Sequence, residues 1–191
     1  MTESELKAQL IKLLASDFDL RSEVRGYNLL TRSVVRADIV GHPKTHLVDA
    51  GFVDAFFCIE VKAVPKEESD KRGRAAAWQA LSYRLSEFDF GIPAFSFVFP
   101  SLRSFYCYDD SIDYVSPSKK DLESMEMRAK LREIEAVMQY GNVGWIEHSK
   151  KTQYSDEDVR LCFAAGRYWS RRRGVTPVKN LGTKLHVGTP K

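Results

Sequence analysis

The chain has 191 residues and a formal net charge of +3, and 43% of its residues are hydrophobic while 29% are charged. This length suffices for one hydrophobic core with additional elements, and the balanced composition excludes a fibrous or low-complexity chain. No apolar run reaches the roughly 18 residues that a membrane-spanning helix needs, and the acidic start at Glu3 and Glu5 does not resemble a signal peptide. We therefore expect a cytoplasmic protein that contacts no membrane.

Leucines at helical spacing predict a first helix over residues 2–16, with Thr2 or Ser4 as its cap. They form one apolar stripe suited to packing on a sheet: Leu6, Leu10, Leu13 and Leu14. Residues 20–30 favour a first strand with a bend at Gly26. The three cysteines stand in apolar surroundings, form no metal-binding motif and are expected to be buried thiols in a reducing compartment: Cys58, Cys107 and Cys162.

Two further apolar runs, residues 33–40 and 55–64, are rich in β-branched and aromatic residues and predict strands. Because side chains alternate faces along a strand, Glu60 and Lys62 project from one face while the residue between them packs on the other. If the two strands pair, Asp38 approaches Glu60, and neighbouring carboxylates repel unless a cation lies between them. Oxygen ligands suit Mg²⁺ or Mn²⁺. Lys62 is then expected to orient or deprotonate an attacking water, or to stabilise charge on the phosphate.

The polar connection after the first of these strands is expected to be a hairpin loop. His42 and His46, together with Asp49, are candidate ligands of a zinc site. This site is a minor alternative, because no further ligand stands at a metal-binding spacing. Asp49 and Asp54 are alternative ligands for the divalent metal. They rank behind Asp38 because neither lies in an evident strand.

Residues 65–74 are dense in charge and are expected to form a mobile loop at the mouth of a cleft, where such loops often grip substrate. Residues 75–88 favour a helix that follows this loop. Gln79 and Tyr83 are four positions apart, so they share one face of that helix and are expected to face the cleft together.

Asp38, then Glu60 with Lys62, then a helix bearing Gln79 and Tyr83, resemble the PD-(D/E)XK nuclease superfamily. The last element resembles the QxxxY motif of its RecB-type exonuclease branch. The resemblance spans about half of the chain. It implies that Asp38 and Glu60 bind a metal and that Lys62 serves the water. It also implies that Gln79 and Tyr83 support the site or contact substrate.

Two features of the sequence depart from the motif of this family, and one further acidic residue extends it. Ala37 stands where the family has a proline, and the interval between the two metal-binding positions is long. In this family a first helix often supplies a further acidic residue to the metal site. Glu5 is the candidate for that role, and Glu23 is the alternative.

The remaining elements complete an α/β architecture. Ser155 is expected to cap a late helix whose first turn is acidic. The order of elements predicts a central mixed sheet flanked by helices, with additional C-terminal helices, and the resemblance implies a restriction-endonuclease-like core. The other expected elements are a buried strand over 94–99, an edge pair over 105–115, a helix over 118–140 and a strand over 143–148.

The chain is expected to divide into a nuclease-like core over 1–116, an elaboration packed on it over 117–173, and a basic tail over 174–191. From Arg167 onward there are seven basic residues and no acidic ones, which favours polyanion binding over a merely solubilising end. The residues expected to contact substrate are Tyr83, Arg36, Arg72, Arg74, Arg171, Arg172 and Arg173.

The leading expectation is a magnesium- or manganese-dependent nuclease that hydrolyses phosphodiester bonds in DNA. The alternative is a catalytically inactive module of the same fold that binds nucleic acid or another protein. A small-molecule enzyme using one carboxylate and the His42 and His46 loop is a third, weaker candidate. DNA is the expected partner, and a second copy of the chain and a separate helicase, phage or repair protein are further candidate partners.

Overall fold

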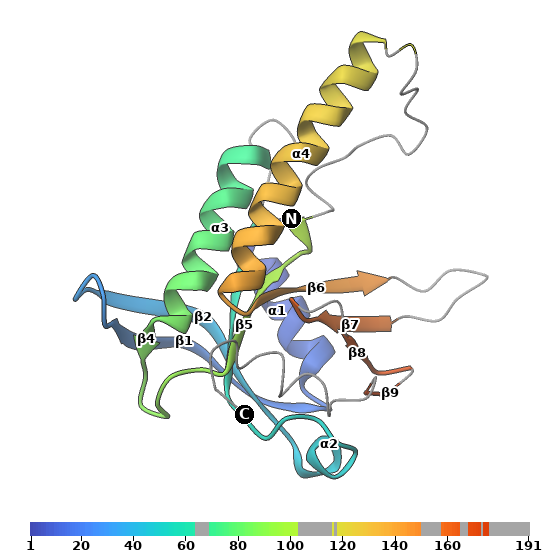
Figure 1. The fold of residues 1–191 in the computed structure, drawn as a ribbon. Helices are drawn as coiled ribbons and strands as arrows, with labels where there is room; N and C mark the ends of the chain where they lie inside the picture. The colour runs from blue at the N-terminus through green and yellow to red at the C-terminus, as the bar shows by residue number, and fades with distance from the viewer. Residues whose placement is uncertain are drawn as a thin grey trace, which may run out of the picture.

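The computed structural model describes residues 1–63, 69–102, 116, 118–149, 158–164, 168–172 and 174–175. Within these residues the fold is α/β, with one nine-stranded mixed sheet whose strand order is β4-β1-β2-β3-β5-β6-β7-β8-β9. The elements in chain order are α1 (Glu3–Leu14), β1 (Phe18–Asn28), β2 (Val34–Pro43), α2 (Thr45–Asp49), β3 (Phe57–Val61), α3 (Ser69–Arg84), β4 (Ser86–Glu87), β5 (Phe95–Phe99), α4 (Lys119–Tyr140), β6 (Val143–Ser149), β7 (Asp158–Cys162), β8 (Tyr168–Ser170) and β9 (Gly174–Val175) (Figure 1).

The direction of each strand follows from its connection. β1, β2 and β3 pair antiparallel, whereas β3, β5 and β6 pair parallel. Parallel neighbours need a crossover, which α3 supplies between β3 and β5 and α4 supplies between β5 and β6. The strands from β6 to β9 return to antiparallel pairing. This arrangement confirms the expected mixed sheet flanked by helices.

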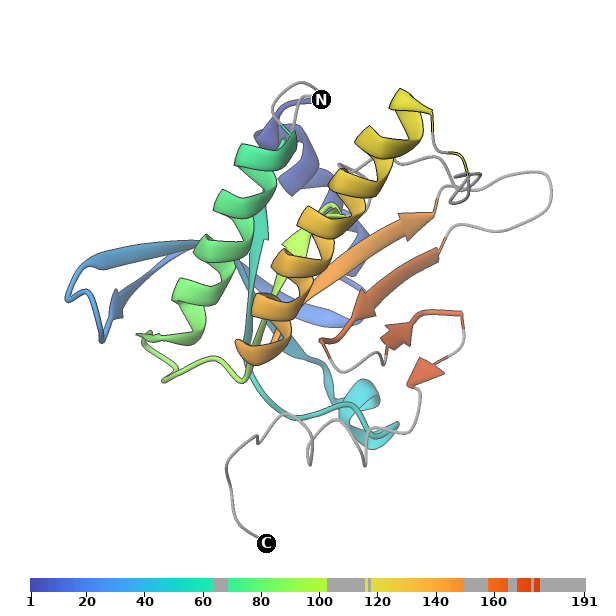
Figure 2. The same ribbon diagram turned by 45° about the horizontal axis from the view of Figure 1, so that its top comes forward.

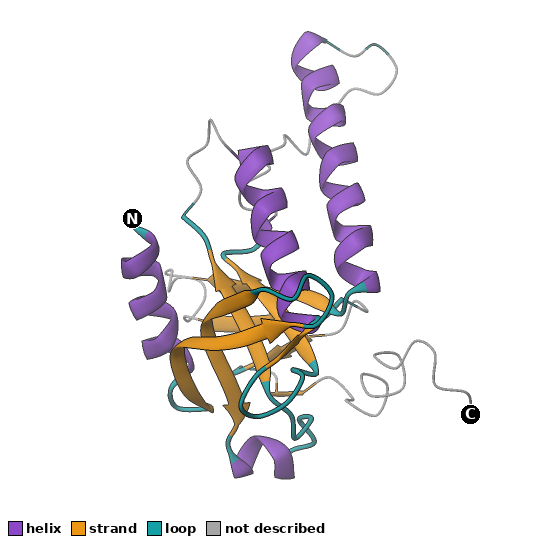
Figure 3. Ribbon diagram, turned by 90° about the vertical axis from the view of Figure 1, so that its left-hand side faces the viewer, coloured by secondary structure: helices purple, strands orange, loops and turns teal. Residues whose placement is uncertain are grey.

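The sheet has helices on both faces: α1 covers one, and α3 with α4 covers the other (Figure 3). Ile59 and Val61 belong to the hydrophobic cluster beneath α1, and Cys58 belongs to a cluster that includes Tyr83 of α3. Alternate residues of β3 therefore pack on opposite faces, as expected for Val61. A strand buried on both faces is apolar throughout, which explains the continuous apolar run before Glu60.

Small residues allow close packing at two places that position the site. Ala76, Ala77 and Ala80 bring α3 close to the sheet and to α4. At Gly41 of β2, an added Cβ would lie 2.4 Å from the ring of Phe57 on β3, so only glycine lets these neighbouring strands pack here.

Four expectations about local structure are wrong. The polar connection over residues 41–46, expected as a hairpin loop, forms the end of β2 and the start of α2. Residues 69–74, expected as part of a loop, form the first part of α3, which ends at Arg84. Gly26 pairs with Val35 inside the hairpin, and the turn falls at residues 29–31 instead. Residues 158–162, expected in a late helix, form β7 between β6 and β8.

Several sequence predictions fall on residues that the structure does not describe. They are the edge pair over 105–115, Cys107, Arg173 and the tail beyond Val175. Of the other two cysteines, Cys58 is buried and Cys162 is half-buried, and both are free thiols. No helix in the described part of the chain is long and apolar enough to cross a membrane.

Candidate functional site

Asp38 and Glu60 lie on neighbouring strands, β2 and β3. The register pairs Ile39 with Ile59, so the next positions along the two strands are Asp38 and Glu60. Asp38 Oδ2 accepts a 2.9 Å hydrogen bond from the backbone N–H of Val61. A side chain of β2 thus takes the place of a backbone carbonyl where the ladder ends. The convergence predicted from the two apolar runs is therefore present.

Glu60 is a buried carboxyl group, with 2% of the residue exposed. Tyr83 of α3, itself 3% exposed, places its hydroxyl 2.5 Å from Glu60 Oε2 and 3.0 Å from the backbone carbonyl of Arg36, and the two oxygens share its one proton. Burial raises the pKa of Glu60 to about 7, and the charge of Asp38 adds to this, while the hydrogen bond from Tyr83 and the charge of Lys62 oppose it. Tyr83 therefore holds the carboxyl group of Glu60 in place.

Lys62 follows β3 and shares the site with Glu60, as expected. Its Nζ lies 3.6 Å from Glu60 Oε1 and 3.5 Å from Glu3 Oε1 of α1. The side chain is about one-fifth exposed. An ammonium group in this position balances the carboxylates and remains accessible to solvent.

A second ammonium group, from Lys7 of α1, bridges two further carboxylates. Lys7 Nζ lies 3.0 Å from Asp38 Oδ1 and also pairs with Glu23 of β1. Burial lowers the pKa of Lys7, but its contacts with Glu23 and Asp38 outweigh that effect and raise the pKa. No local sequence pattern identifies Lys7, because it stands on a helix whose orientation is set by tertiary packing.

Glu23 joins this group through an unusual backbone conformation. The β1–β2 register pairs Ser22 with Ile39 and Val24 with Ala37, which places Glu23 opposite Asp38. Its φ of 57° lies in the left-handed region that non-glycine residues seldom adopt. We define Glu3, Glu23, Asp38 and Glu60, with Lys7 and Lys62, as the carboxylate cluster.

Glu5 is not among the side chains that contact this cluster. It accepts from the backbone of Thr2 in a capping box at the start of α1, and that hydrogen bond, with one from the Thr2 side chain, lowers the pKa of Glu5. Of the two acidic candidates near the start of the chain, the structure brings Glu23 and not Glu5 to Asp38. The register with β2 is the reason, and no local sequence signal reports it.

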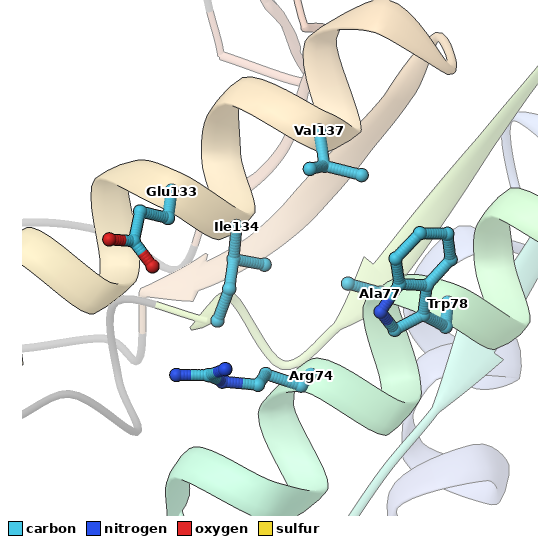
Figure 4. A pocket seen from close by; sticks show the side chains of 6 residues that line it. All are labelled: Arg74, Ala77, Trp78, Glu133, Ile134 and Val137. Carbon is cyan, nitrogen blue, oxygen red and sulfur yellow. The ribbon is translucent and has the colours of Figure 1, made fainter.

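Gln79 is exposed on α3, one turn before Tyr83 and on the same face of the helix. Arg72 donates to the carbonyl of Ala63, just after β3, at 3.3 Å. Arg74 instead lines a pocket of about 170 Å³ between α3 and α4, together with Trp78 and Glu133 (Figure 4). No member of the carboxylate cluster lines that pocket.

The predicted substrate contact at Arg171 is engaged elsewhere in the fold. Its guanidinium bonds Asp17 at 2.6 Å, Ser16 and the carbonyl of Leu13, and so ties β8 to the end of α1. Burial tends to raise the pKa of Asp17, but hydrogen bonds from Ser16 and Arg171 outweigh it and lower the pKa. The exposed Arg172 follows and donates its backbone N–H to Asp158.

The two histidines of the alternative zinc site pair with different carboxylates. His42 Nε2 lies 3.1 Å from Asp54 Oδ1, and His46 Nε2 lies 3.5 Å from Asp17 Oδ1. Both line an open hollow with Asp19. Among the described residues, no three His, Cys, Asp or Glu side chains gather closely enough to hold a metal. This arrangement does not suit zinc, which is usually held by three or four protein ligands.

Asp38 and Glu60 fit a different kind of metal. Mg²⁺ keeps several of its waters and is commonly held by one or two carboxylates together with substrate phosphate. The ammonium groups of Lys7 and Lys62 lie against these two carboxylates, so the site favours positive charge. The donor set therefore fits Mg²⁺ or Mn²⁺ at Asp38 and Glu60.

Comparisons with protein-family models, with curated proteins and with solved structures find no match for this chain. Functional inference therefore rests on the carboxylate cluster itself. Its distinguishing feature is a buried carboxyl group beside a lysine, since such groups are seldom buried without a structural or chemical role.

Glu60→Gln should stabilise the protein at high pH. The pKa of Glu60 lies near 7 in the folded state, above its ordinary value of 4.5, so the native state binds more protons between these pH values. Stability contributed by this group is present below about pH 4.5 and is lost as the pH rises through 7. At about 1.4 kcal/mol per pKa unit, the difference in the free energy of unfolding is at most about 3.5 kcal/mol.

Urea unfolding at several pH values from 4 to about 8.5 measures this effect. Glu60→Gln should gain stability relative to the parent as the pH rises, whereas the exposed Glu123→Gln on α4 should track the parent. Parallel stability curves for Glu60→Gln and the parent would show that Glu60 is ionised normally in the folded protein.

Proposed function

We propose that this protein is a magnesium- or manganese-dependent nuclease that hydrolyses phosphodiester bonds in DNA, with a site of the PD-(D/E)XK type. The observation that carries the proposal is the grouping of Asp38, the buried Glu60 and Lys62 where β2 and β3 meet, with Tyr83 of α3 holding Glu60. Two neighbouring antiparallel strands, β2 and β3, and the crossover helix α3 thus bring together residues far apart in the sequence.

Asp38 and Glu60 are the residues that would hold the metal, and the bound ion would supply a Lewis acid for the phosphate and a more acidic water. Lys62 would position the attacking water or stabilise charge on the phosphate, because its ammonium lies beside Glu60 and is partly exposed. Tyr83 fixes the orientation of the Glu60 carboxyl group through a hydrogen bond. Preorganised charge of this kind lowers the barrier without rearrangement during the reaction.

Glu23 is the further acidic residue that we assign to this site in place of Glu5, since it shares Lys7 with Asp38. Gln79 lies one turn from Tyr83 and is exposed, so a role in contacting substrate is compatible with its position. A second copy of the chain and a helicase, phage or repair protein remain proposed partners.

Incubation of the purified protein with linear, circular and single-stranded DNA, in Mg²⁺ or Mn²⁺, tests the proposal. We expect cleavage that stops when the metal is chelated. Attack on circular DNA would indicate endonucleolytic action, and attack on linear DNA alone would indicate exonucleolytic action. Binding of DNA without cleavage under all of these conditions would favour the inactive nucleic-acid-binding module instead.

A further inference from the structure

The hairpin formed by β1 and β2 extends to the outer edge of the molecule, beside the end of α3 (Figure 2). We call residues 24–37 the hairpin arm. Its end is fixed by a backbone hydrogen bond from Leu29 to Leu85 at 2.9 Å and by the pairing of Tyr27 with Glu87 of β4. The arm is therefore an ordered, two-stranded ribbon with one end at the carboxylate cluster.

The hairpin arm carries positive charge alone. It contains Arg25, Arg32 and Arg36 and no acidic residue. Arg25 and Arg36 are direct cross-strand partners, and all three arginines are exposed. Like charges placed opposite each other in a sheet destabilise it. Such a pair is relieved by an anion that contacts both side chains.

Only one of these three arginines forms an ion pair within the described part of the chain, so the other two are available to bind an external anion. Arg36 Nε bonds Glu23 Oε2 at 2.8 Å. Neither Arg25 nor Arg32 forms an ion pair with any carboxylate in the described part of the chain. The exposed guanidinium group of Arg25 thus lies beside Arg36, two positions from Asp38, whereas that of Arg32 lies beside the turn of the arm.

The arm also presents apolar side chains to solvent at its tip. Leu30 is 72% exposed and Val34 is 71% exposed, and Tyr27 and Leu29 are nearly half exposed. Exposed apolar groups bordered by arginines suit a surface with alternating charged and apolar parts. The phosphates of DNA and the thymine methyl groups in its major groove provide such a surface.

We propose that the hairpin arm enters the major groove of duplex DNA, where its arginines hold phosphates and its tip contacts base edges. The groove of B-form DNA admits a two-stranded ribbon, whereas that of A-form RNA is too deep and narrow. The backbone carbonyl of Arg36 accepts the hydroxyl of Tyr83, so the arm is joined to the residue that positions Glu60. The inference rests on the proposed function for the chemistry that follows binding.

Fluorescence anisotropy with a labelled 20-base-pair DNA duplex tests the proposal in EDTA, where cleavage by a metal-dependent site is blocked. The double variant Arg25→Gln with Arg32→Gln should bind on the order of 30-fold more weakly at 0.1 M salt. Its slope of log affinity against log salt should be shallower by roughly 1.8, because each phosphate contact contributes about 0.9. Leu30→Ser should weaken binding without changing the slope, since it removes no charge.

Lys12→Gln with Lys119→Gln is the matched control, because it removes two exposed positive charges outside the arm. It should change duplex affinity by less than about threefold. Binding to a duplex RNA of the same sequence should be weaker and much less sensitive to the arm variants. Thermal unfolding of each variant confirms that the fold is retained.

Equal duplex DNA affinities for the arm variant and the matched control would overturn the inference, as would absence of duplex binding by the parent. Changed sedimentation of the arm variants with unaltered DNA affinity would also overturn it, and would make the arm an interface between copies of this chain. DNA binding through the arm without metal-dependent cleavage would support the inference while overturning the nuclease proposal. Metal-dependent cleavage at the same rate in the parent and the arm variants would support the nuclease proposal and overturn the inference about the arm.

Discussion

Lys62→Ala should lower the rate of DNA cleavage by about 10²- to 10⁴-fold, the usual contribution of a positioned proton-transfer or charge-stabilising group. The reason is its location: Lys62 Nζ lies 3.6 Å from Glu60 Oε1, beside the proposed metal position. DNA affinity should change little, because one ammonium group supplies a small share of all phosphate contacts. Single-turnover cleavage and anisotropy titrations measure the two effects separately.

Two companion variants make this experiment specific. Lys119→Ala removes an exposed lysine of α4 and should cleave at the parental rate. Lys62→Arg keeps the charge but replaces a group that can lose its proton with one that cannot. Partial activity in Lys62→Arg would assign charge stabilisation to Lys62, and loss of activity would assign proton transfer. Parental activity in Lys62→Ala would remove Lys62 from the mechanism.

Asp38→Asn and Glu60→Gln should abolish stabilisation of the fold by Mg²⁺ or Mn²⁺. A ligand that binds only the folded state stabilises it by about 2.7 kcal/mol when present at 100 times its dissociation constant. Both variants remove a charged oxygen ligand that the ammonium groups of Lys7 and Lys62 now approach. Thermal unfolding across a metal titration should show a rising midpoint in the parent and a flat one in each variant.

Calorimetric titration gives an independent measurement of the same metal binding. Glu123→Gln is the matched control for loss of a carboxylate, because this residue is exposed on α4, and it should bind metal like the parent. Unchanged metal affinity in both Asp38→Asn and Glu60→Gln would show that the metal is held elsewhere.

The sequence was sufficient to predict the strands that carry the site, and their physical signal explains why. β3 and β5 are buried on both faces, so they appear as uninterrupted apolar runs. Antiparallel pairing of β2 with β3 then brings Asp38 to Glu60, as predicted. The long helix α4 was also predicted closely, because Ser118 forms a capping box with Asp121.

Elements with weak or conflicting local signals were predicted wrongly. The start of α3 is charged and its amphipathic pattern is weak, because alanines make the contact with the sheet. Residues 158–162 follow acidic residues that resemble the first turn of a helix. Pairing with β6 and β8 on both sides makes this segment a strand, so tertiary contacts outweighed the local preference.

Residue roles that depend on tertiary packing could not be predicted. Arg171 was expected to contact phosphate, yet it binds Asp17 and the end of α1. Lys7 and Glu23 were brought to Asp38 by the docking of α1 and by the register of β1. The spacing of residues along the chain predicts neither the docking of α1 nor the register of β1. The proximity of Glu60 and Lys62 is local, so it could be predicted.

Metal-dependent cleavage of DNA by the parent, Glu60→Gln and Glu123→Gln, measured side by side, tests the assignment of the carboxylate cluster most directly. We predict cleavage by the parent and by Glu123→Gln in Mg²⁺ or Mn²⁺, none in EDTA, and a rate on the order of 10³-fold lower for Glu60→Gln. Cleavage by Glu60→Gln at the parental rate, or cleavage by the parent in EDTA, would contradict the proposed site.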